Sequence, residues 1–480
     1  MTRTASLSLL TLGLLLGLSA CKAGPDYKGP PPTAAGAQAR GAFLRGDGDT
    51  LNAAPSARWW EALGDPVLTG LVDDALAHSP NIDAAQAKIT QARAGLAGNR
   101  AALLPSLGTS FVAPYINLPA GTLGLAEDSG ERIGSTSYSV AFDASWELDL
   151  RGANRRKVES AAAKADAAEA GLADAQVSLS AEVARAYVSL RLRQAMAAAQ
   201  EQQAGIDRSL VSLAEQRLTA GTAPAQPLDQ ARSQLAQSES DLAKSRAETL
   251  VLIDQIAVLT GREPGALDTL LSTPASIPQP PAQVAVGDPA SLMRNRPDIR
   301  TAERQLAAAN ADIGAKIAAR FPKVSFIGLL GLGGTSIGDI VDPSSVLGAV
   351  LPQISWSLFD GGRSAADVRS AKGAHAEADA KYRTAVLTAL QDAENSLTRF
   401  GAQRIAYARA LDARDRAAHS AGLQAQRAAA GTAGRSDALS ARRQQLQAEL
   451  TAASARADLS TAFVAVEKAL GLGWTPSFAK

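Results

Sequence analysis

Residues 152–224 read GANRRKVESAAAKADAAEAGLADAQVSLSAEVARAYVSLRLRQAMAAAQEQQAGIDRSLVSLAEQRLTAGTAP, and this stretch decides the fold. It has no proline before Pro224 and is rich in Ala, Leu, Gln, Glu, Arg and Lys, which lose least free energy on entering a helix. The segment Gly221-Thr222-Ala223-Pro224 has the pattern of one helix ending and another beginning. We therefore predict helices over about 152–220 and 225–262, folded back as an antiparallel hairpin.

The length of the first helix limits how it can be packed. At 1.5 Å per residue it would be about 100 Å long, which exceeds the width of an ordinary globular core. Leu228, Leu235 and Leu242 recur every seven residues, the spacing of helices that wind around one another. We expect these helices to pack lengthwise against others of the same kind. From this stretch alone, a long coiled coil in a soluble scaffold is an equally good interpretation.

Composition excludes several classes of protein. The 480 residues include 48 basic and 47 acidic ones, so there is no basic excess of the kind that nucleic-acid-binding proteins show. Cys21 is the single cysteine, which rules out an internal disulfide and a cysteine metal site. The sequence contains no GxSxG, P-loop, HExxH or dinucleotide-binding motif. We therefore expect no enzyme activity, no metal, no cofactor and no nucleic-acid partner.

The N-terminus has the features of an export signal. Arg3 supplies the positive charge, and the apolar run from Leu7 to Leu18 is too short for a convincing membrane span. The run ends in Leu18-Ser19-Ala20-Cys21, which resembles the bacterial lipobox. We expect Cys21 to carry an S-diacylglycerol and an N-acyl group, since two or three acyl chains anchor a protein stably. The alternative is a plain signal peptide with an incidental cysteine.

A different periodicity appears between residues 138 and 150. Apolar or small residues alternate there with mostly polar ones, from Tyr138 through Trp146 to Leu150, which is the pattern of a membrane-spanning strand. Its expected partner is the segment of about residues 106–115. Amphipathic strands packed on a soluble core would give the same pattern.

The second half of the chain repeats the first. Pro80 corresponds to Pro297 at an offset of 217, and Gly221-Thr222 corresponds to Gly431-Thr432 at an offset of 210. Helices of equal length with an insertion confined to the strand hairpin are what a long barrel needs, because a surface loop changes length cheaply. The predicted parts are 1–20, a signal peptide; 21–58, a lipidated N-terminal tether without a core; 59–262, a first repeat with a β-hairpin at about 106–150 and a helical hairpin at about 152–262; 263–289, a proline-rich linker; 290–471, a second repeat with a β-hairpin at about 323–360 and a helical hairpin at about 362–470; and 472–480, a tail.

Four motifs together resemble one known family. They are Cys21 with Gly24-Pro25-Asp26-Tyr27, Trp59-Trp60-x-x-Leu63-Gly64-Asp65-Pro66, Trp356-x-Leu358-Phe359-Asp360-Gly361-Gly362, and Ala469-Leu470-Gly471-x-Gly473-Trp474. In order and spacing, over essentially all of the mature chain, the sequence resembles the outer membrane factors, the TolC-like efflux channels, in their NodT/OprM-like lipoprotein branch.

The resemblance implies a mainly α fold with a pair of transmembrane β-hairpins. Three protomers with four strands each would close a twelve-stranded β-barrel in the outer membrane, and their long helices would form an α-barrel in the periplasm. It implies a passive conduit that exports drugs or other small molecules from an inner-membrane pump of the resistance-nodulation-division type, through a periplasmic adaptor, to the exterior. Four strands alone leave two open edges in lipid, so trimerisation also has a physical reason. The alternative is a coiled-coil structural lipoprotein without a pore.

Candidate gate residues lie at the turns between the long helices. We expect the turns 221–227 and 431–436 to form the periplasmic mouth. The resemblance places Asp437 at the constriction, whereas Ser440 stands where some relatives have a second acid. Without the resemblance, Asp437 would be interpreted as a first-turn acid that stabilises a helix N-terminus. Asp229 is a weaker candidate, and Arg435 is expected to pair with a neighbouring helix. The residues expected to dock the adaptor are Gly221, Thr222, Gly431 and Thr432.

Overall fold

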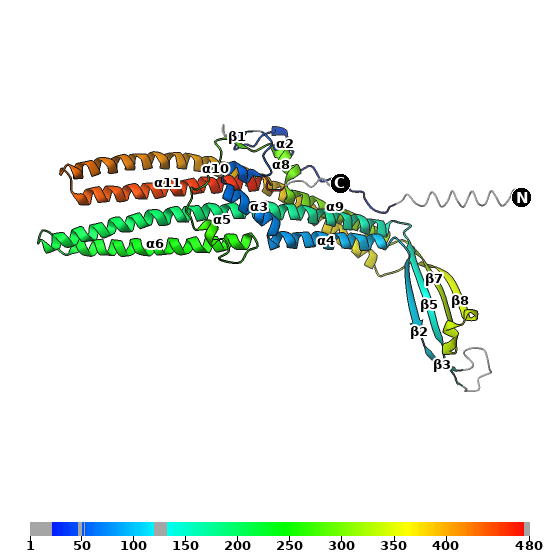
Figure 1. Ribbon diagram of the computed structural model, residues 1–480. Helices are drawn as coiled ribbons and strands as arrows, with labels where there is room; N and C mark the ends of the chain where they lie inside the picture. Colours follow the sequence, from blue (N-terminus) through cyan, green and yellow to red (C-terminus); the bar gives the residue numbers. More distant parts are fainter. Residues whose placement is uncertain (1–21, 47–49, 52, 120–131, 475–480) are drawn as a thin grey trace. The chain divides into compact units, whose positions relative to one another are not determined.

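The computed structural model describes residues 22–46, 50, 51, 53–119 and 132–474. The chain divides into two compact units (Figure 1). The strand-bearing unit comprises the described residues up to Pro31 together with Ile89–Ala168 and Ala302–Tyr382. The helical unit comprises Pro32–Lys88, Glu169–Thr301 and the chain from Arg383 onwards. The signal peptide and Cys21 lie outside the described residues.

Two long helical hairpins dominate the structure. The first consists of α5 (Ala153–Thr219) and α6 (Gln226–Leu259), and the second of α10 (Arg363–Ala429) and α11 (Arg435–Ala469). Helices α5 and α10 are both 67 residues long. The mainly α fold with an internal repeat is therefore confirmed, and the helix bounds agree with the predicted ones to within a few residues.

The two hairpin turns are built in the same way. Gly221 and Gly431 have φ angles of 67° and 73°, a left-handed conformation that glycine adopts without steric cost. In the first turn, the backbone N–H of Thr222 donates to the carbonyl of Arg217 at 2.9 Å. In the second, Thr432 donates to Arg427 at the same distance. Each helix thus ends in a Schellman motif that satisfies its last carbonyls.

Shorter helices precede each hairpin. They are η2 (Trp59–Leu63), α3 (Pro66–His78) and α4 (Pro80–Ala101) in the first repeat, and α8 (Pro289–Asn295) and α9 (Pro297–Ala318) in the second. An aspartate caps the start of α3 and of α8. The carboxylate of Asp65 accepts from the N–H of Val67 at 2.9 Å, and that of Asp288 accepts from Ser291 at 2.8 Å. In both helices proline follows the cap, where its missing N–H costs nothing.

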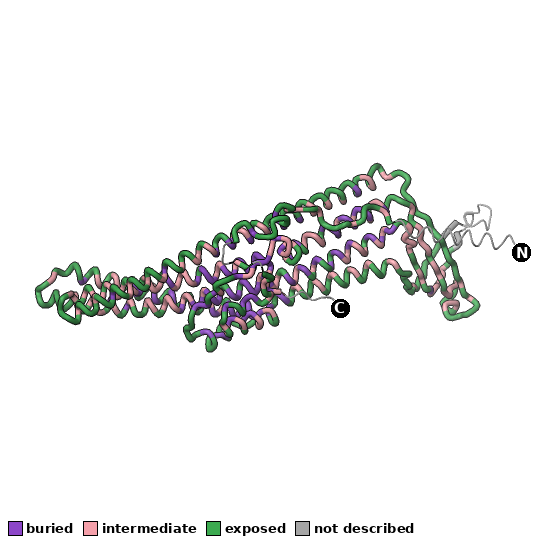
Figure 2. The backbone as a smooth tube through the Cα atoms, turned by 90° about the horizontal axis from the view of Figure 1, so that it is seen from above, coloured by how far each residue is buried: buried purple, intermediate pink, exposed green. Residues whose placement is uncertain are grey.

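The core of the helical unit lies where α3 and η2 meet the long helices. Trp59 and Trp60 are almost completely buried, and the Trp59 ring lies 6.0 Å from that of Phe463 on α11. The phenol of Tyr187 on α5 donates to the carboxylate of Asp65 at 2.8 Å. Buried residues are concentrated in this region, whereas the hairpin ends are mostly exposed or half-buried (Figure 2). The tryptophans that open the first repeat therefore tie the two repeats together.

The predicted tether without a core needs correction. Residues 32–58 belong to the helical unit and include α2 (Ala35–Arg40) and β1 (Thr50–Leu51). Phe43 is buried, and the N–H groups of Leu44 and Arg45 donate to the carboxylate of Glu394 at 2.9 Å each. One aromatic side chain and two backbone donors are enough to hold a segment that its proline and glycine content suggested would be free.

The proline-rich segment 263–289 lies against the long helices. It contains α7 (Asp268–Leu271) and β6 (Val284–Ala285), and β6 pairs in parallel with β1. The amide of Gln194 on α5 donates to the carbonyl of Leu271 at 2.6 Å, and the hydroxyl of Ser460 on α11 donates to that of Pro278 at 2.6 Å. Side chains from both repeats thus donate hydrogen bonds to backbone carbonyls of this segment.

The strand-bearing unit contains a four-stranded antiparallel sheet. The strands are β2 (Ser106–Val112), β5 (Tyr138–Leu148), β7 (Lys323–Gly334) and β8 (Val346–Ser355), in the order β2-β5-β7-β8. Strands β3 (Tyr115–Pro119) and β4 (Arg132–Thr136) extend the first hairpin, and η4 (Ile337–Val341) and η5 (Pro343–Ser345) lie in the second. The two repeats meet at the β5–β7 pair.

Among the residues described, none of the helices is both apolar enough and long enough to cross a membrane.

Candidate functional site

The two hairpin turns lie at the same end of the helical unit (Figure 1). All four predicted docking residues are at these turns, and the two threonines use their hydroxyls locally. Thr222 Oγ1 donates to the carbonyl of Arg217 at 3.0 Å, and Thr432 Oγ1 donates to that of Arg427 at 3.1 Å. The exposed part of each turn is therefore a rigid backbone loop rather than a set of free polar side chains.

Asp437 lies in the first turn of α11, exposed to solvent. Its carboxylate accepts from the backbone N–H of Gly434 at 3.2 Å, while its own N–H donates to the carbonyl of that glycine at 3.0 Å. The acid at the third helical position thus reaches back to the N-cap amide, which is the half of a capping box that a glycine N-cap allows. The helix-capping role considered from the sequence is therefore present, and an exposed carboxylate at a hairpin end is also available to a pore.

The other two gate candidates make fewer contacts. Asp229 is exposed in the first turn of α6. Arg435 begins α11 and lines a shallow hollow between α10 and α11 with Leu439 and Arg442. Within the described part of the chain, Arg435 makes no ion pair. Its predicted pairing with a neighbouring helix stays a prediction about another copy of the chain.

One face of the sheet carries a band of mostly apolar side chains. Phe142 on β5 lies between Thr109 on β2 and Leu330 on β7, and the next pair along is Val140 with Leu332. Phe142 and Leu330 are more than half exposed. Large apolar side chains that face outward across neighbouring strands are typical of the lipid-facing surface of a transmembrane sheet.

The opposite face is less polar than β5 alone suggested. Glu147 on β5 lies beside Ser325 on β7, which in turn lies beside Gln353 on β8. Two positions earlier along β5, however, Ser145 lies beside Ile327, and that isoleucine lies beside Leu351. The alternation predicted for β5 therefore does not extend across β7 and β8, since their inward positions mix polar and apolar residues.

Hydrogen bonds hold the strands to the neighbouring helices. One tryptophan contact occurs in both repeats, and a further contact belongs to the first repeat. The indole of Trp146 donates to the carbonyl of Leu103 at 3.1 Å, and the indole of Trp356 donates to that of Arg320 at 3.1 Å. In the first repeat, the carboxylate of Asp149 accepts from the N–H of Arg155 at 2.9 Å. The tryptophan contacts join the strands to the turns that follow α4 and α9, and the Asp149 contact joins the end of β5 to the start of α5.

Sequence reasoning missed a buried arginine, Arg156, near the start of α5. Its side chain is 1% exposed, and it donates to the carbonyls of Ala23 and Gly24 at 3.0 and 3.2 Å and to the carboxylate of Asp26 at 2.8 Å. Arg156 thus binds the segment that directly follows Cys21. The chain around it is uniformly helical and rich in basic residues, so no local signal distinguishes it.

The described residues contain no group of three or more His, Cys, Asp or Glu side chains placed to hold a metal ion. His78 is exposed and interacts with Asp74, four residues before it on α3.

The comparisons with known proteins agree on one family. The family model described as outer membrane efflux protein matches residues 71–262 and 289–472. The chain is 28% identical over 385 residues to the nodulation protein T of Rhizobium leguminosarum, covering 79% of each. It is 29% identical over 484 residues to the solvent efflux pump outer membrane protein SrpC of Pseudomonas putida, covering 98% of each. The solved structure of the outer-membrane channel OprN has 32% identity and a TM-score of 0.85, with 95% of this chain and 100% of that chain covered.

The chain belongs to the outer membrane efflux protein family. The two matched ranges are the two repeats, and the gap between them is the proline-rich segment. The resemblance to the NodT/OprM-like outer membrane factors is confirmed. This outer membrane efflux protein is a channel component of an efflux system, located in the outer membrane with a tunnel in the periplasm.

Proposed function

We propose that three copies of this outer membrane efflux protein close into one passive conduit. It would receive drugs or other small molecules from an inner-membrane pump and a periplasmic adaptor and release them outside the cell. The observation that carries the proposal is the strand order β2-β5-β7-β8, in which β2 and β8 have no partner on their outer edges within the described residues. Unpaired backbone groups at a sheet edge are not viable in lipid, so the edges need other copies of the chain.

The number of copies follows from the size of the barrel. Two copies would give eight strands, whose interior is filled by side chains. Three copies give twelve strands, which is the smallest closed arrangement of this sheet with room for a lumen. The band of apolar side chains that contains Phe142 and Leu330 would then face the lipid.

The long helices have apolar flanks that a single protomer leaves uncovered. The exposed large apolar residues are Leu250, Val251 and Val258 on α6, and Leu387, Ile405 and Leu423 on α10. Each of them is between 46% and 67% exposed. Surface apolar residues scattered singly need no explanation, but two rows on separate helices favour contact with neighbouring copies. We assign the α6 row of one protomer to the α10 row of the next.

The partners follow from the same arrangement. The turns at Gly221 and Gly431 would present two similar loops per protomer, and six per trimer, to a periplasmic adaptor. Asp437 would contribute one carboxylate per protomer to the mouth, where three like charges favour cations. The name of the relative SrpC specifies a solvent efflux pump. We propose small organic molecules as the cargo here and a pump of the resistance-nodulation-division type as the source.

Two further parts of the proposal concern chemistry. Cys21 would carry the diacylglycerol and N-acyl groups, so that the chain is anchored in the outer membrane by lipid as well as by its strands. The protein would form or break no bond itself, because conduction needs only the lumen. The alternative, a structural coiled-coil lipoprotein, has no use for a sheet with an apolar outer band.

The test is a comparison of assembly and conduction in one set of proteins. We expect the purified full-length protein to run as a trimer and to conduct ions in planar bilayers. Val258→Asp and Leu387→Asp, placed on the two flanks, should each reduce the trimer fraction and the frequency of channel insertion. Leu270→Asp, at a residue of α7 that is 51% exposed and lies on neither flank, is the matched control. A wild-type protein that is monomeric and gives no channels would refute the proposal.

A further inference from the structure

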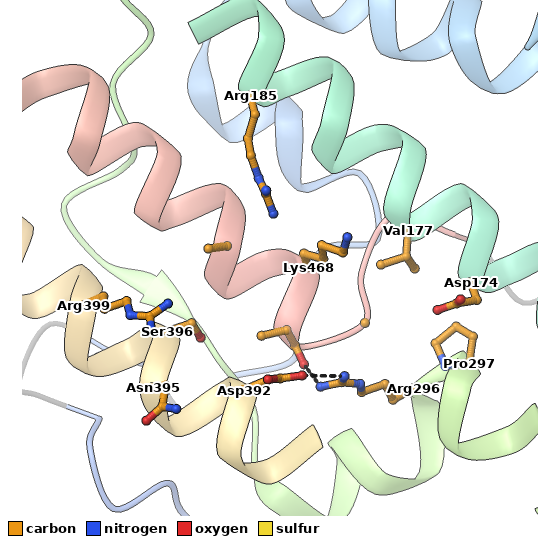
Figure 3. A pocket seen from close by; sticks show the side chains of 13 residues that line it. Asp174, Val177, Arg185, Arg296, Pro297, Asp392, Asn395, Ser396, Arg399 and Lys468 are labelled. Atoms are coloured by element: carbon orange, nitrogen blue, oxygen red, sulfur yellow. Dashed lines mark hydrogen bonds and ion pairs between the residues drawn. The ribbon is translucent and has the colours of Figure 1, made fainter. Parts of the chain in front are cut away.

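A hollow of about 250 Å³ lies in the helical unit where α5, α10, α11 and the start of α9 meet (Figure 3). Basic side chains line it from all four places: Arg185 on α5, Arg399 on α10, Lys468 on α11, and Arg296 directly before α9. We call this the basic hollow. The acidic residues in its lining are Asp174 and Asp392.

One of the four cations is already neutralised. The guanidinium of Arg296 donates to Asp298 at 2.9 Å and to Asp392 at 3.0 Å. It also donates to the carbonyls of Ala389 and Ala469 at 3.1 and 2.8 Å. Arg296 therefore joins α9, α10 and α11, and it accounts for the charge of Asp392.

Of the other three cations, two have no direct partner among the described residues and the third interacts with one carboxyl group. Arg185 and Arg399 make no ion pair or hydrogen bond within the residues that the structure describes. Lys468 interacts with Asp174, whose pKa is raised first by burial and then by the charge of Asp298, with Lys468 and Arg296 opposing the rise. Four basic groups thus stand against three carboxyl groups, those of Asp174, Asp298 and Asp392, and the guanidinium groups of Arg185 and Arg399 have no direct partner among the described residues.

The internal repeat shows that packing does not require these cations. The long helices of the second repeat correspond to those of the first at an offset of 210 residues. By this offset, Arg399 corresponds to Ser189 and Lys468 corresponds to Val258. Arg185 corresponds to Asn395, which itself lines the basic hollow. Each of these three cations has a neutral counterpart in the other repeat, which builds the same helices, so helix packing by itself does not require a charge at these positions.

We propose that the basic hollow binds an oxyanion, the carboxylate or phosphate group of a small organic solute. The planar guanidinium groups of Arg185 and Arg399 suit the paired oxygens of such groups, and Lys468 adds a point charge beside them. A volume of 250 Å³ is below the usual range for a drug-sized ligand. The hollow therefore takes the charged end of a solute, with the rest outside it.

The consequence for transport rests on the proposed function. If the protein is a conduit, the basic hollow retains anionic cargo on the helices, and the class of substrate it favours is small organic acids or phosphate esters. The binding itself does not depend on conduction, so the two proposals can fail separately.

Equilibrium binding to the full-length protein in detergent tests the site directly. The probes are sodium benzoate, a carboxylate, and inorganic phosphate, titrated calorimetrically at low ionic strength. We expect saturable binding of at least one probe, and the tighter probe identifies the preferred group. Since a charge-assisted hydrogen bond contributes about 1.5 to 3 kcal/mol, Arg185→Gln or Arg399→Gln should each weaken binding by about 10- to 150-fold.

A matched variant controls for the loss of one positive charge. Arg409 is also exposed on α10 but does not line the basic hollow, so Arg409→Gln should leave the affinity unchanged. Thermal melting of each variant checks that folding is preserved. The inference is overturned if the wild type binds neither probe saturably, or if the double variant of Arg185 and Arg399 binds as tightly as the wild type. Binding without channel activity would instead refute only the proposed function.

Discussion

The guanidinium of Arg156 lies 2.8 Å from the carboxylate of Asp26, although the two residues are 130 positions apart in the chain. Next to them, Gly152 has a φ of 74°, and a Cβ atom there would lie 3.3 Å from the Cα of Lys22. The N–H of Ala23 also donates to the carbonyl of Arg151 at 3.0 Å. The segment that follows Cys21 is thus held against the start of α5, where the helix leads on from strand β5.

Replacing Arg156 should release the N-terminal segment. The carbonyls of Ala23 and Gly24 would lose their donor, and the carboxylates of Asp26 and Glu159 would lose their contacts with the guanidinium. We expect Arg156→Gln to destabilise the protein by about 3 kcal/mol, the scale for breaking a buried charged network. Limited proteolysis should then cut between residues 22 and 31 faster than in the wild type.

The control for that experiment is Asp26→Asn. Its side chain is 76% exposed, and without its charge the buried Arg156 keeps its ion pair with Glu159 at 2.9 Å and its contacts with the carbonyls of Ala23 and Gly24. We expect a change below about 1 kcal/mol and little extra proteolysis. Equal effects of the two variants would mean that the exposed ion pair, rather than the buried carbonyl contacts, holds the segment.

Glu467 should make stability depend on pH. It lies on α11 one turn after Phe463, it is 4% exposed, and its Oε2 has no hydrogen-bond partner among the described residues. Burial raises its pKa to about 8 from an ordinary value of 4.5. Because the folded state holds the proton more tightly, the contribution of Glu467 to stability is full below pH 4.5 and is lost as the pH rises towards 8.

Glu467→Gln removes this titration. At about 1.36 kcal/mol per unit of pKa difference, the wild type should lose a few kcal/mol between pH 5 and pH 8 that the variant keeps. The measurement is the difference in melting temperature between the two proteins at those two pH values. A difference that does not change with pH would show that Glu467 is ionised in the folded protein.

Two substitutions at Asp437 separate its helix-capping role from its charge. Asp437→Asn keeps an oxygen that can accept from Gly434 but removes the charge, whereas Asp437→Ala removes both. If the carboxylates line the mouth, both variants should raise single-channel conductance or weaken cation preference in planar bilayers. Only the alanine variant should lower stability, by about 1 kcal/mol. Unchanged conductance and selectivity in both would remove Asp437 from the gate.

The two faces of β7 give a matched pair of substitutions in the sheet. Leu330 lies in the outward apolar band, and Ser325 lies on the opposite face between Glu147 and Gln353. We expect Leu330→Arg to cost about 2 to 4 kcal/mol in the membrane and to reduce the amount of assembled protein. Ser325→Arg should assemble normally and change ion conductance. If Leu330→Arg assembles normally and Ser325→Arg does not, the face that carries Ser325 is the one that contacts lipid.

Much of the fold was predictable because the signals are local. Helix propensity over a long stretch without proline and the glycines at residues 221 and 431 specified both hairpins to within a few residues. Their threonines and glycines form the same turn in both halves, which the repeat in the sequence had indicated. The tether was predicted less well, because a single buried residue, Phe43, decides whether such a segment packs.

The sites were less predictable than the elements. Asp437 was located from the sequence, but its hydrogen bond to Gly434 became visible only in the structure. The alternation in β5 was correct for that strand and did not indicate Ile327 and Leu351 on the same inner face. A strand's own pattern reports on one strand, whereas a sheet face is set by registers between strands from both repeats.

By itself, the sequence determined the long helices, their turns, the repeat and the family, because propensity, periodicity and spacing act between residues close together or at fixed offsets. Only the tertiary structure decided that Arg156 holds the residues after Cys21, that Glu467 is buried without a counter-charge, and that Arg185, Arg399 and Lys468 surround one hollow. Those relationships join residues from separate helices, and the free energy that fixes them comes from packing and desolvation, which depend on the whole fold.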